Sequence, residues 1–325
     1  EQNLKRMYNA VFLPLLSSLY GVKKIYYIPC GGLTQLNFDL LKNNNGIELG
    51  KLYVMSRQTF PHKLVKNQPI YKKNIKNVVI FGGITYDSSY VSHTQKPTLT
   101  PMFRNTDFND LDNTKYEIEQ IASIFNNKKI QNHIFSGANA TEDSFKKNSI
   151  QPIDIIHIAT HGFCLDTDAD LTKNKKYTNQ TNPRTNREAA MLFSGLAFAG
   201  ANKTWKGTFD GQGYENGILT AYEISQLDLS KVKFVVLSAC ETAKGWIYDF
   251  DGVFGLQRAF KQAGAGSILM SLWKVDDQAT ALFMEHFYKF LLQSGDRHEA
   301  LKLAQDEVKK QYPDPYYWAA WVMLD

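Results

Sequence analysis

The sequence has few cysteines, no long apolar run and no dominant charge, and each shortage excludes a class of protein. Three cysteines in 325 residues cannot form a disulfide framework, and they lack the C-x-x-C spacing typical of zinc sites. A reducing compartment, the cytoplasm, fits this composition. No apolar run reaches the ~20 residues of a bilayer-spanning helix, so no membrane partner is expected. The net charge of +5 comes from 37 basic and 32 acidic residues that are scattered along the chain, so nucleic-acid binding is not expected either.

Two kinds of apolar pattern alternate along the chain. Short runs rich in β-branched residues predict buried strands, and segments with apolar residues every three or four positions predict helices. This alternation is typical of an α/β fold with a mainly parallel sheet and helices on both faces. The predicted strands are 25–29, 51–56, 78–83, 130–135, 153–160, 233–239 and 267–273, and the predicted helices are 114–125, 253–264, 276–295 and 298–310.

Local signals support two of these helices and divide the chain. Thr114 and Glu117 have the spacing of a capping box, and Gly264 predicts the end of helix 253–264. The polar, lysine-rich residues 57–77 predict a connection between an N-terminal section, residues 1–74, and a catalytic domain, residues 75–325. The polar stretch 165–190 is too long for an ordinary loop, which favours a mobile or functional segment. Because the first residue is Glu1 and not methionine, we expect a longer protein.

Two predicted strands end in reactive side chains. Strand 153–160 runs into His161 and Gly162, and strand 233–239 runs into Cys240. Parallel strands bring their carboxyl ends to one edge of a sheet, where α/β proteins hold their ligands. An imidazole has the pKa to deprotonate a thiol, and the N–H groups of Gly162 and Cys240 can hold an oxyanion. The pattern predicts a His161/Cys240 pair for nucleophilic catalysis, with a buried structural cysteine as the alternative.

The remaining histidine and cysteines near these positions have simpler interpretations. His157 and His161 lie four residues apart, which on a helix would suit zinc. Their surroundings predict a strand and no third ligand is present, so no metal is expected and His157 is interpreted as a buried histidine. Cys30 and Cys164 are interpreted as packed or incidental thiols.

At this point the motifs resemble a known family, the CHAT domain. This is a bacterial caspase-like peptidase module related to separase and commonly found behind TPR repeats. The H-G and S-A-C-E-T signatures occur in order at predicted strand ends, and the resemblance covers nearly the whole chain. The stretches that carry it are 25-IYYIPCGGLTQLNFDLL-41, 153-IDIIHIATHGF-163, 217-GILTAYEISQLDL-229, 234-FVVLSACETAKG-245, 252-GVFGLQRAFKQAGAGSILMSLWKVDDQAT-280 and 316-YYWAAWVMLD-325.

The resemblance implies a fold, an activity and a type of partner. The fold would be a caspase-like three-layer sandwich, and the activity that of a cysteine endopeptidase without a cofactor. His161 matches the family's catalytic histidine, Cys240 its nucleophile and Gly162 the oxyanion-hole glycine. The partners would be a protein substrate and an upstream TPR or sensor region or a separate activator. The role would be in bacterial defence or regulated cell death, and residues 165–190 would be a regulatory or self-cleaved segment, with plain disorder as the alternative.

The resemblance also suggests a substrate pocket. Residues 271–280 are similar to the separase stretch whose aspartate faces the basic residue before the scissile bond. Asp277 would then form the floor of the first specificity pocket and Trp273 a wall. Asp276 and Asp277 as caps of the following helix are an equal alternative. Asp87, after strand 78–83, is a second candidate.

Two other functions remain open from the sequence. The chain could be a catalytically silent interaction module in which His161 and Cys240 are relics, although a degenerate copy would more often have lost one of them. A nucleotide-binding regulator on the same kind of sheet would need a phosphate-binding loop. The glycine pairs 31–32 and 82–83 do not continue into one.

Overall fold

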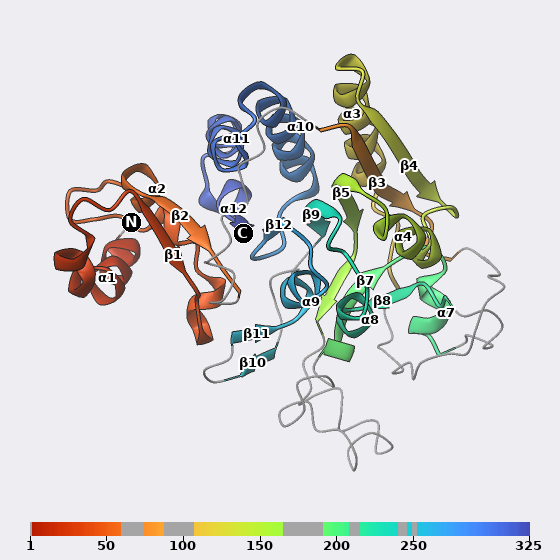
Figure 1. The fold of residues 1–325 in the computed structure, drawn as a ribbon, viewed down its shortest axis with the longest axis horizontal. Coiled ribbons are helices and arrows are strands. Elements are labelled where there is room, and N and C mark those ends of the chain that lie inside the picture. Colours follow the sequence, from red (N-terminus) through yellow and green to blue (C-terminus); the bar gives the residue numbers. More distant parts are fainter. Residues whose placement is uncertain are drawn as a thin grey trace, which may run out of the picture.

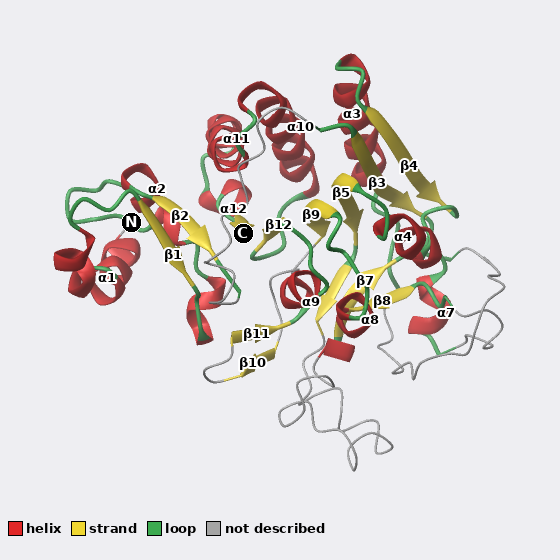
Figure 2. Cartoon of the chain, viewed as in Figure 1, coloured by secondary structure: helices red, strands yellow, loops and turns green. Residues whose placement is uncertain are grey.

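A central mixed sheet organises the chain, as Figures 1 and 2 show. The computed structural model describes residues 2–59, 75–87, 107–164, 191–207, 215–239, 246–248 and 252–325. Eight strands form the sheet in the order β1-β2-β13-β12-β9-β5-β3-β4. They are β1 (Lys24–Tyr27), β2 (Val54–Arg57), β3 (Asn77–Ile84), β4 (Gln131–Gly137), β5 (Ile153–Thr160), β9 (Val232–Ala239), β12 (Ser267–Ser271) and β13 (Trp321–Leu324).

The strand directions decide which residues meet. Strands β12, β9, β5, β3 and β4 are parallel to one another, whereas β13 runs antiparallel to β12 and is followed by β2 and β1 in its own direction. Central strand β5 is buried along its whole length, as a strand covered on both faces must be. The carboxyl ends of β3, β5, β9 and β12 therefore lie at one edge of the sheet.

Helices cover one face of the sheet and pack on the alternate residues that point to it. This layer contains α3 (Asp112–Asn127), α10 (Asp277–Ser294), α11 (Arg297–Gln311) and α12 (Pro315–Trp318). Their apolar side chains form one buried cluster with strand residues such as Ile155, Phe234 and Leu269. The predicted helices at 114–125, 276–295 and 298–310 are thus present with shifted ends.

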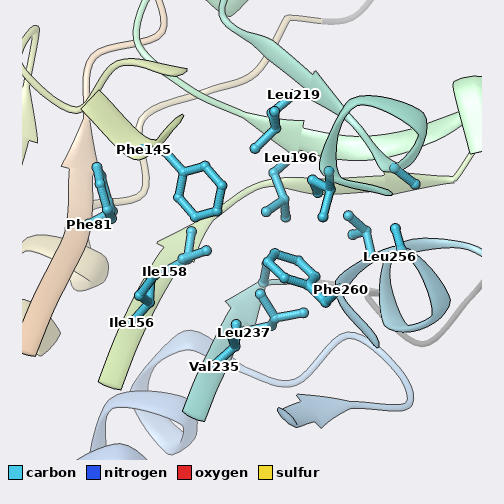
Figure 3. Close-up of a cluster of buried hydrophobic side chains, with 14 of the residues drawn as sticks. Phe81, Phe145, Ile156, Ile158, Leu196, Leu219, Val235, Leu237, Leu256 and Phe260 are labelled. Atoms are coloured by element: carbon cyan, nitrogen blue, oxygen red, sulfur yellow. The ribbon is translucent and has the colours of Figure 1, made fainter. Parts of the chain in front are cut away.

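The opposite face is covered by short helices and a small second sheet. The helices are α4 (Glu142–Ser149), α7 (Ala201–Trp205), α8 (Ala221–Ser225) and α9 (Leu256–Gln262), and the small sheet contains β6 (Gly162–Cys164), β7 (Ser194–Ala197) and β8 (Ile218–Thr220). Figure 3 shows Ile156, Ile158, Val235 and Leu237 of the main sheet meeting Phe145, Leu196 and Phe260 of this layer. Helices on both faces confirm the predicted α/β sandwich.

The N-terminal section has a core of its own. It consists of α1 (Gln2–Val11), α2 (Leu49–Leu52), strands β1 and β2, and the 3₁₀ helices Leu13–Leu19, Gly31–Gln35 and Phe38–Leu40, packed around buried residues such as Phe12, Phe38 and Leu41. It joins the main sheet where Arg57 of β2 pairs with Leu324 of β13. The segment 165–190 lies outside the described residues. Every helix of the described ranges is too short or too polar to cross a membrane.

Three local predictions differ from the structure. Predicted strand 51–56 begins as helix α2, and β2 starts only at Val54. Predicted helix 253–264 begins as strand β11 (Gly252–Phe254), which pairs with β10 (Trp246–Tyr248), because extended Gly255 separates it from α9. Gly264 does follow that helix, with a φ of 100° that favours glycine.

The predicted capping box is the third difference. Helix α3 begins at Asp112, so Thr114 lies inside its first turn and its hydroxyl donates to the carbonyl oxygen of Leu111 at 2.6 Å. The same hydroxyl accepts the N–H of Gly83 at 3.1 Å and so ties α3 to β3. Glu117 points inward instead of capping the helix.

A buried polar contact joins both helices α3 and α10 to strand β5. His157 has no exposed surface, which confirms its interpretation as a buried histidine. Its Nε2 lies 3.0 Å from Oε1 of Glu117, out of line for a hydrogen bond, and its Nδ1 is hydrogen-bonded to the Tyr288 hydroxyl at 3.0 Å. Because a buried polar group is costly without a partner, these contacts fix which faces of α3 and α10 lie against β5.

This contact predicts that removal of one hydroxyl group, that of Tyr288, lowers the stability of the protein. Tyr288→Phe leaves Nδ1 of His157 buried without its partner, so we expect the free energy of unfolding to fall by about 1–3 kcal/mol. Urea unfolding measures this change. Tyr316→Phe is the control, because Tyr316 is 47% exposed and the change there should stay within about 0.5 kcal/mol. Equal stability of the two variants would contradict the anchoring role.

Candidate active site

The candidate site lies where β5 and β9 leave the sheet. Thr160, the last residue of β5, pairs with Ala239, the last residue of β9. His161 directly follows Thr160, and Cys240 directly follows Ala239. Neighbouring strands lie about 4.8 Å apart, so the two strands end within reach of a single substrate group. Cys240 itself lies outside the described residues.

One hydrogen bond decides the protonation pattern of His161. Its Nε2 lies 2.7 Å from the backbone carbonyl oxygen of Asn109. A carbonyl oxygen only accepts hydrogen bonds, so Nε2 must carry the proton in the neutral ring. Nδ1 then holds the lone pair that a general base needs. The sequence contained no signal for Asn109, because a main-chain atom makes the contact and any residue type supplies one.

Two aromatic rings pack beside His161, and burial and nearby charges change its basicity. The ring centroid of Tyr86 lies 5.0 Å from that of His161, and the centroid of Phe108 lies 5.3 Å away. Burial lowers the pKa of His161 below its ordinary value, and the positive charge of Lys274 lowers it further. The carbonyl of Asn109 and the charges of Asp277 and Asp110 raise the pKa in part. The net lowering keeps more of the ring neutral at pH 7.

The N–H of Gly162 points toward the outer edge of the small sheet. The N–H of Ala197 in β7 donates to the carbonyl of His161 at 2.9 Å, so His161, directly before β6, and Ala197 extend the antiparallel ladder of β6 and β7 as a hydrogen-bonded pair. Such pairs alternate with non-hydrogen-bonded ones, and Gly162 with Leu196 is the next pair. The N–H of Gly162 therefore points away from β7. Strand β6 is the edge of its sheet within the described part of the chain.

The two adjacent aspartates at the start of α10 have different surroundings. Asp276 caps the helix, since its carboxylate accepts the N–H groups of Gln278 and Ala279 at 3.0 and 3.1 Å. The half-buried Asp277 instead lines a small cavity between α3 and α10, together with Glu117 and Ser238. The capping alternative therefore holds for Asp276.

The cavity beside Asp277 is polar and small. Its volume of about 30 Å³ has room for about two water molecules, so it is too small for a long side chain in this state. The Ser238 hydroxyl on its wall is buried and has no hydrogen-bond partner among the described residues. Trp273 is partly buried against the cores on both faces of the sheet, and its Nε1 donates to the carbonyl of Tyr316 at 3.0 Å.

Asp87 lies beyond the end of β3. It directly follows Tyr86, whose ring packs beside that of His161. Its side chain is 72% exposed. The side-chain amide of Asn202 donates to it at 3.1 Å, and the Lys206 ammonium lies 3.9 Å away. The structure thus places both acidic candidates, Asp87 and Asp277, at the edge of the sheet that carries His161.

The thiols outside the candidate pair lie in two places. Cys164 is part of β6, where it pairs with Ser194 of β7. Cys30 is exposed and precedes the 3₁₀ helix Gly31–Gln35 of the N-terminal section. Within the described ranges, no group of three or more His, Cys, Asp or Glu side chains is arranged to hold a metal ion.

The charges around His161 predict opposite effects for two substitutions. Lys274→Gln removes a positive charge and should raise the pKa of His161, whereas Asp277→Asn removes a negative charge and should lower it. Titration of the histidine ring signals by NMR measures both shifts. Lys128→Gln at the far end of α3 is the control and should leave the pKa unchanged. A shift of the same sign in both variants would contradict this description of the site.

Comparisons with known proteins agree with the fold. The crystal structure of the Arg-specific cysteine proteinase gingipain R has a TM-score of 0.51 and 9% identity, over 99% of this chain and 66% of that one. A complex of Porphyromonas gingivalis RgpB pro- and mature domains has a TM-score of 0.50 and 10% identity, over 99% of this chain and 67% of that one. At this identity the likeness concerns the fold alone, and it confirms the predicted caspase-like sandwich.

Sequence comparison identifies the family. Tetratricopeptide repeat protein 28 of Mus musculus is 38% identical over 111 residues, which are 33% of this chain. The Homo sapiens protein of the same name is 36% identical over the same length. This chain spans only 4% of either relative. A family model, the CHAT domain, matches residues 1–324, so the chain belongs to the CHAT domain family.

Proposed function

We propose that this chain is a cysteine endopeptidase that cleaves a partner protein, with Cys240 as nucleophile and His161 as base. The observation that carries the proposal is the hydrogen bond from Nε2 of His161 to the carbonyl of Asn109, 2.7 Å long. It leaves the lone pair on Nδ1, at the end of the strand that pairs with β9. The fold likeness to cysteine proteinases supports the same chemistry.

The proposed reaction proceeds through a thioester. Nδ1 of His161 takes the thiol proton, and the Cys240 thiolate attacks the peptide carbonyl carbon. The N–H groups of Gly162 and Cys240 hold the oxyanion, a role supported by the outward direction of the Gly162 N–H. His161 returns the proton to the departing amine. It then removes a proton from water, which hydrolyses the thioester and restores the thiol.

The substrate and the control of the reaction complete the proposal. Asp277 forms the floor of the first specificity pocket with Trp273 as a wall, and Asp87 is the second candidate. The cavity beside Asp277 has a volume of only about 30 Å³, so the cavity must widen before a basic side chain of the substrate can enter it. A TPR or sensor region, or a separate activator, controls the enzyme; the matches to tetratricopeptide repeat proteins support this part. The proposed cytoplasmic location rests on the composition. The proposed role in defence or regulated cell death rests on the family resemblance.

Covalent labelling tests the pair. A thiol-reactive peptide with a basic end residue should modify Cys240 selectively, and His161→Ala should slow this reaction by about 10²–10⁴-fold, since it removes the base. Mass spectrometry of wild type, Cys240→Ala and His161→Ala measures the rates. Cys30 and Cys164 are internal controls. Equal, slow labelling of all three cysteines, with or without an activator, would favour a catalytically silent interaction module.

A matched pair of variants tests the substrate pocket. Asp277→Asn should reduce the preference for a basic over a neutral end residue by about 10–100-fold, the loss expected for one hydrogen bond to a charged group. Asp87→Asn makes the same chemical change at the other acidic candidate and should leave the preference unaltered. Competition between an arginine-ending and a norleucine-ending inhibitor measures it. Loss of preference only in Asp87→Asn would assign the pocket to Asp87.

A further inference from the structure

We propose that Asn202 is a positioning residue that sets the tautomer and the orientation of His161. Its consequence for catalysis rests on the proposed function, but its effect on the ring does not. Asn202 belongs to the short helix α7, which follows β7, and it is only 1% exposed. Figure 1 shows α7 on the side of the molecule where β7 and β8 lie.

The side chain of Asn202 binds the backbone of one residue at two points. Its Oδ1 accepts the N–H of Phe108 at 2.8 Å, and its Nδ2 donates to the carbonyl of Phe108 at 3.0 Å. In a sheet, the N–H and the carbonyl of one residue form the same two hydrogen bonds to a residue of the neighbouring strand. Phe108 belongs to no strand of the sheets in the described part of the chain. Here the amide of Asn202 takes the place of a strand.

The same residue holds the chain on both sides of residues 88–106. Nδ2 of Asn202 also donates to Asp87 at 3.1 Å, and the backbone N–H of Asn202 donates to the carbonyl of Tyr86 at 3.1 Å. Lys206 adds an ion pair with Asp107, 2.7 Å long. Helix α7 thus brings together residues 86–87 and 107–108, which are separated by twenty positions or so in the sequence.

Both of these segments contact the His161 ring. Tyr86 and Phe108 supply the two aromatic neighbours, and Asn109, directly after Phe108, supplies the carbonyl that accepts the Nε2 proton. The ring of Trp205, also in α7, packs on Phe108 with centroids 4.5 Å apart. If the amide of Asn202 is lost, the backbone of Phe108 loses both hydrogen bonds that fix it, and Asn109 beside it loses this support. The Nε2 proton then loses its fixed acceptor, and both neutral tautomers become populated.

The test reads the tautomer directly. In protein labelled with ¹⁵N-histidine, NMR should find neutral His161 protonated at Nε2 in wild type and a mixture of both tautomers in Asn202→Ala. The His161 signals are those that disappear in His161→Gln. Asn202→Asp gives a second variant of nearly the same volume, in which the donor to Phe108 and Asp87 becomes an acceptor. It should show the same mixture, so the test does not depend on the folding of a single variant.

A matched control separates positioning from a general loss of stability. Asn37 is another buried asparagine, 4% exposed, and donates to the carbonyls of Ala319 and Trp321 at 2.9 and 3.4 Å. Asn37→Ala should lower the melting temperature but leave the His161 tautomer as in wild type. A wild-type tautomer in both Asn202→Ala and Asn202→Asp, each shown to be folded, would overturn the inference.

Labelling of Cys240 links the inference to the reaction. Its rate should fall at least 10-fold in Asn202→Ala and should remain near the wild-type rate in Asn37→Ala. If wild-type Cys240 reacts no faster than Cys30 and Cys164, the proposed function fails, while the tautomer result still decides the role of Asn202. If labelling requires His161 but the tautomer is unchanged in both Asn202 variants, the peptidase stands and the positioning role is rejected.

Discussion

The structure depends on one constraint, the complete burial of strand β5. All of its side chains are covered by a layer on each face, and β3 and β9 pair with its two edges. A slip of β5 by one residue would exchange the side chains that face the two layers and would move His157 to the other face. His157 adds a polar contact that only one register satisfies, through Glu117 and Tyr288. The position of His161, directly after β5, follows from this register.

The chemistry of His161 depends on contacts from other parts of the chain. Two aromatic rings pack beside it, its partial burial lowers its pKa, and a main-chain carbonyl accepts the Nε2 proton. These groups come from residues 86 and 107–109, and helix α7 holds both segments through Asn202. Strand β5 thus sets the position of His161. Residues 86, 107–109 and helix α7 set the protonation state and the orientation of its ring. If α7 were disturbed while the sheet stayed stable, His161 would keep its position after β5. Its neutral ring would no longer have a single tautomer with the lone pair on Nδ1.

The success of the sequence predictions followed the strength of the local patterns. Strand 153–160 and the helix that became α10 were placed almost to the residue, because long apolar periodicity and a clear cap or glycine stop define them. The segment 253–264 was only partly right, since extended Gly255 interrupts a pattern that looks helical. Thr114 and Glu117 matched a capping box, yet α3 starts two residues earlier, the Thr114 hydroxyl accepts the N–H of Gly83 in β3, and Glu117 lies 3.0 Å from His157 in β5. The division at residue 74 stays a prediction.

The sequence alone determined the α/β class, the strand that ends at His161, the CHAT resemblance and the two residues predicted to react. These properties depend on periodicity and on short motifs, which are local. Only the tertiary structure decided which nitrogen of His161 holds the proton, that Asp276 caps a helix while Asp277 lines a cavity, and that Asn202 holds Phe108. The sequence had offered both aspartates as helix caps and could not choose between them, while the facts about His161, Asp277 and Asn202 depend on main-chain groups and on residues tens of positions apart. Their contacts leave no pattern in a single sequence, because a backbone acceptor has no preferred residue type.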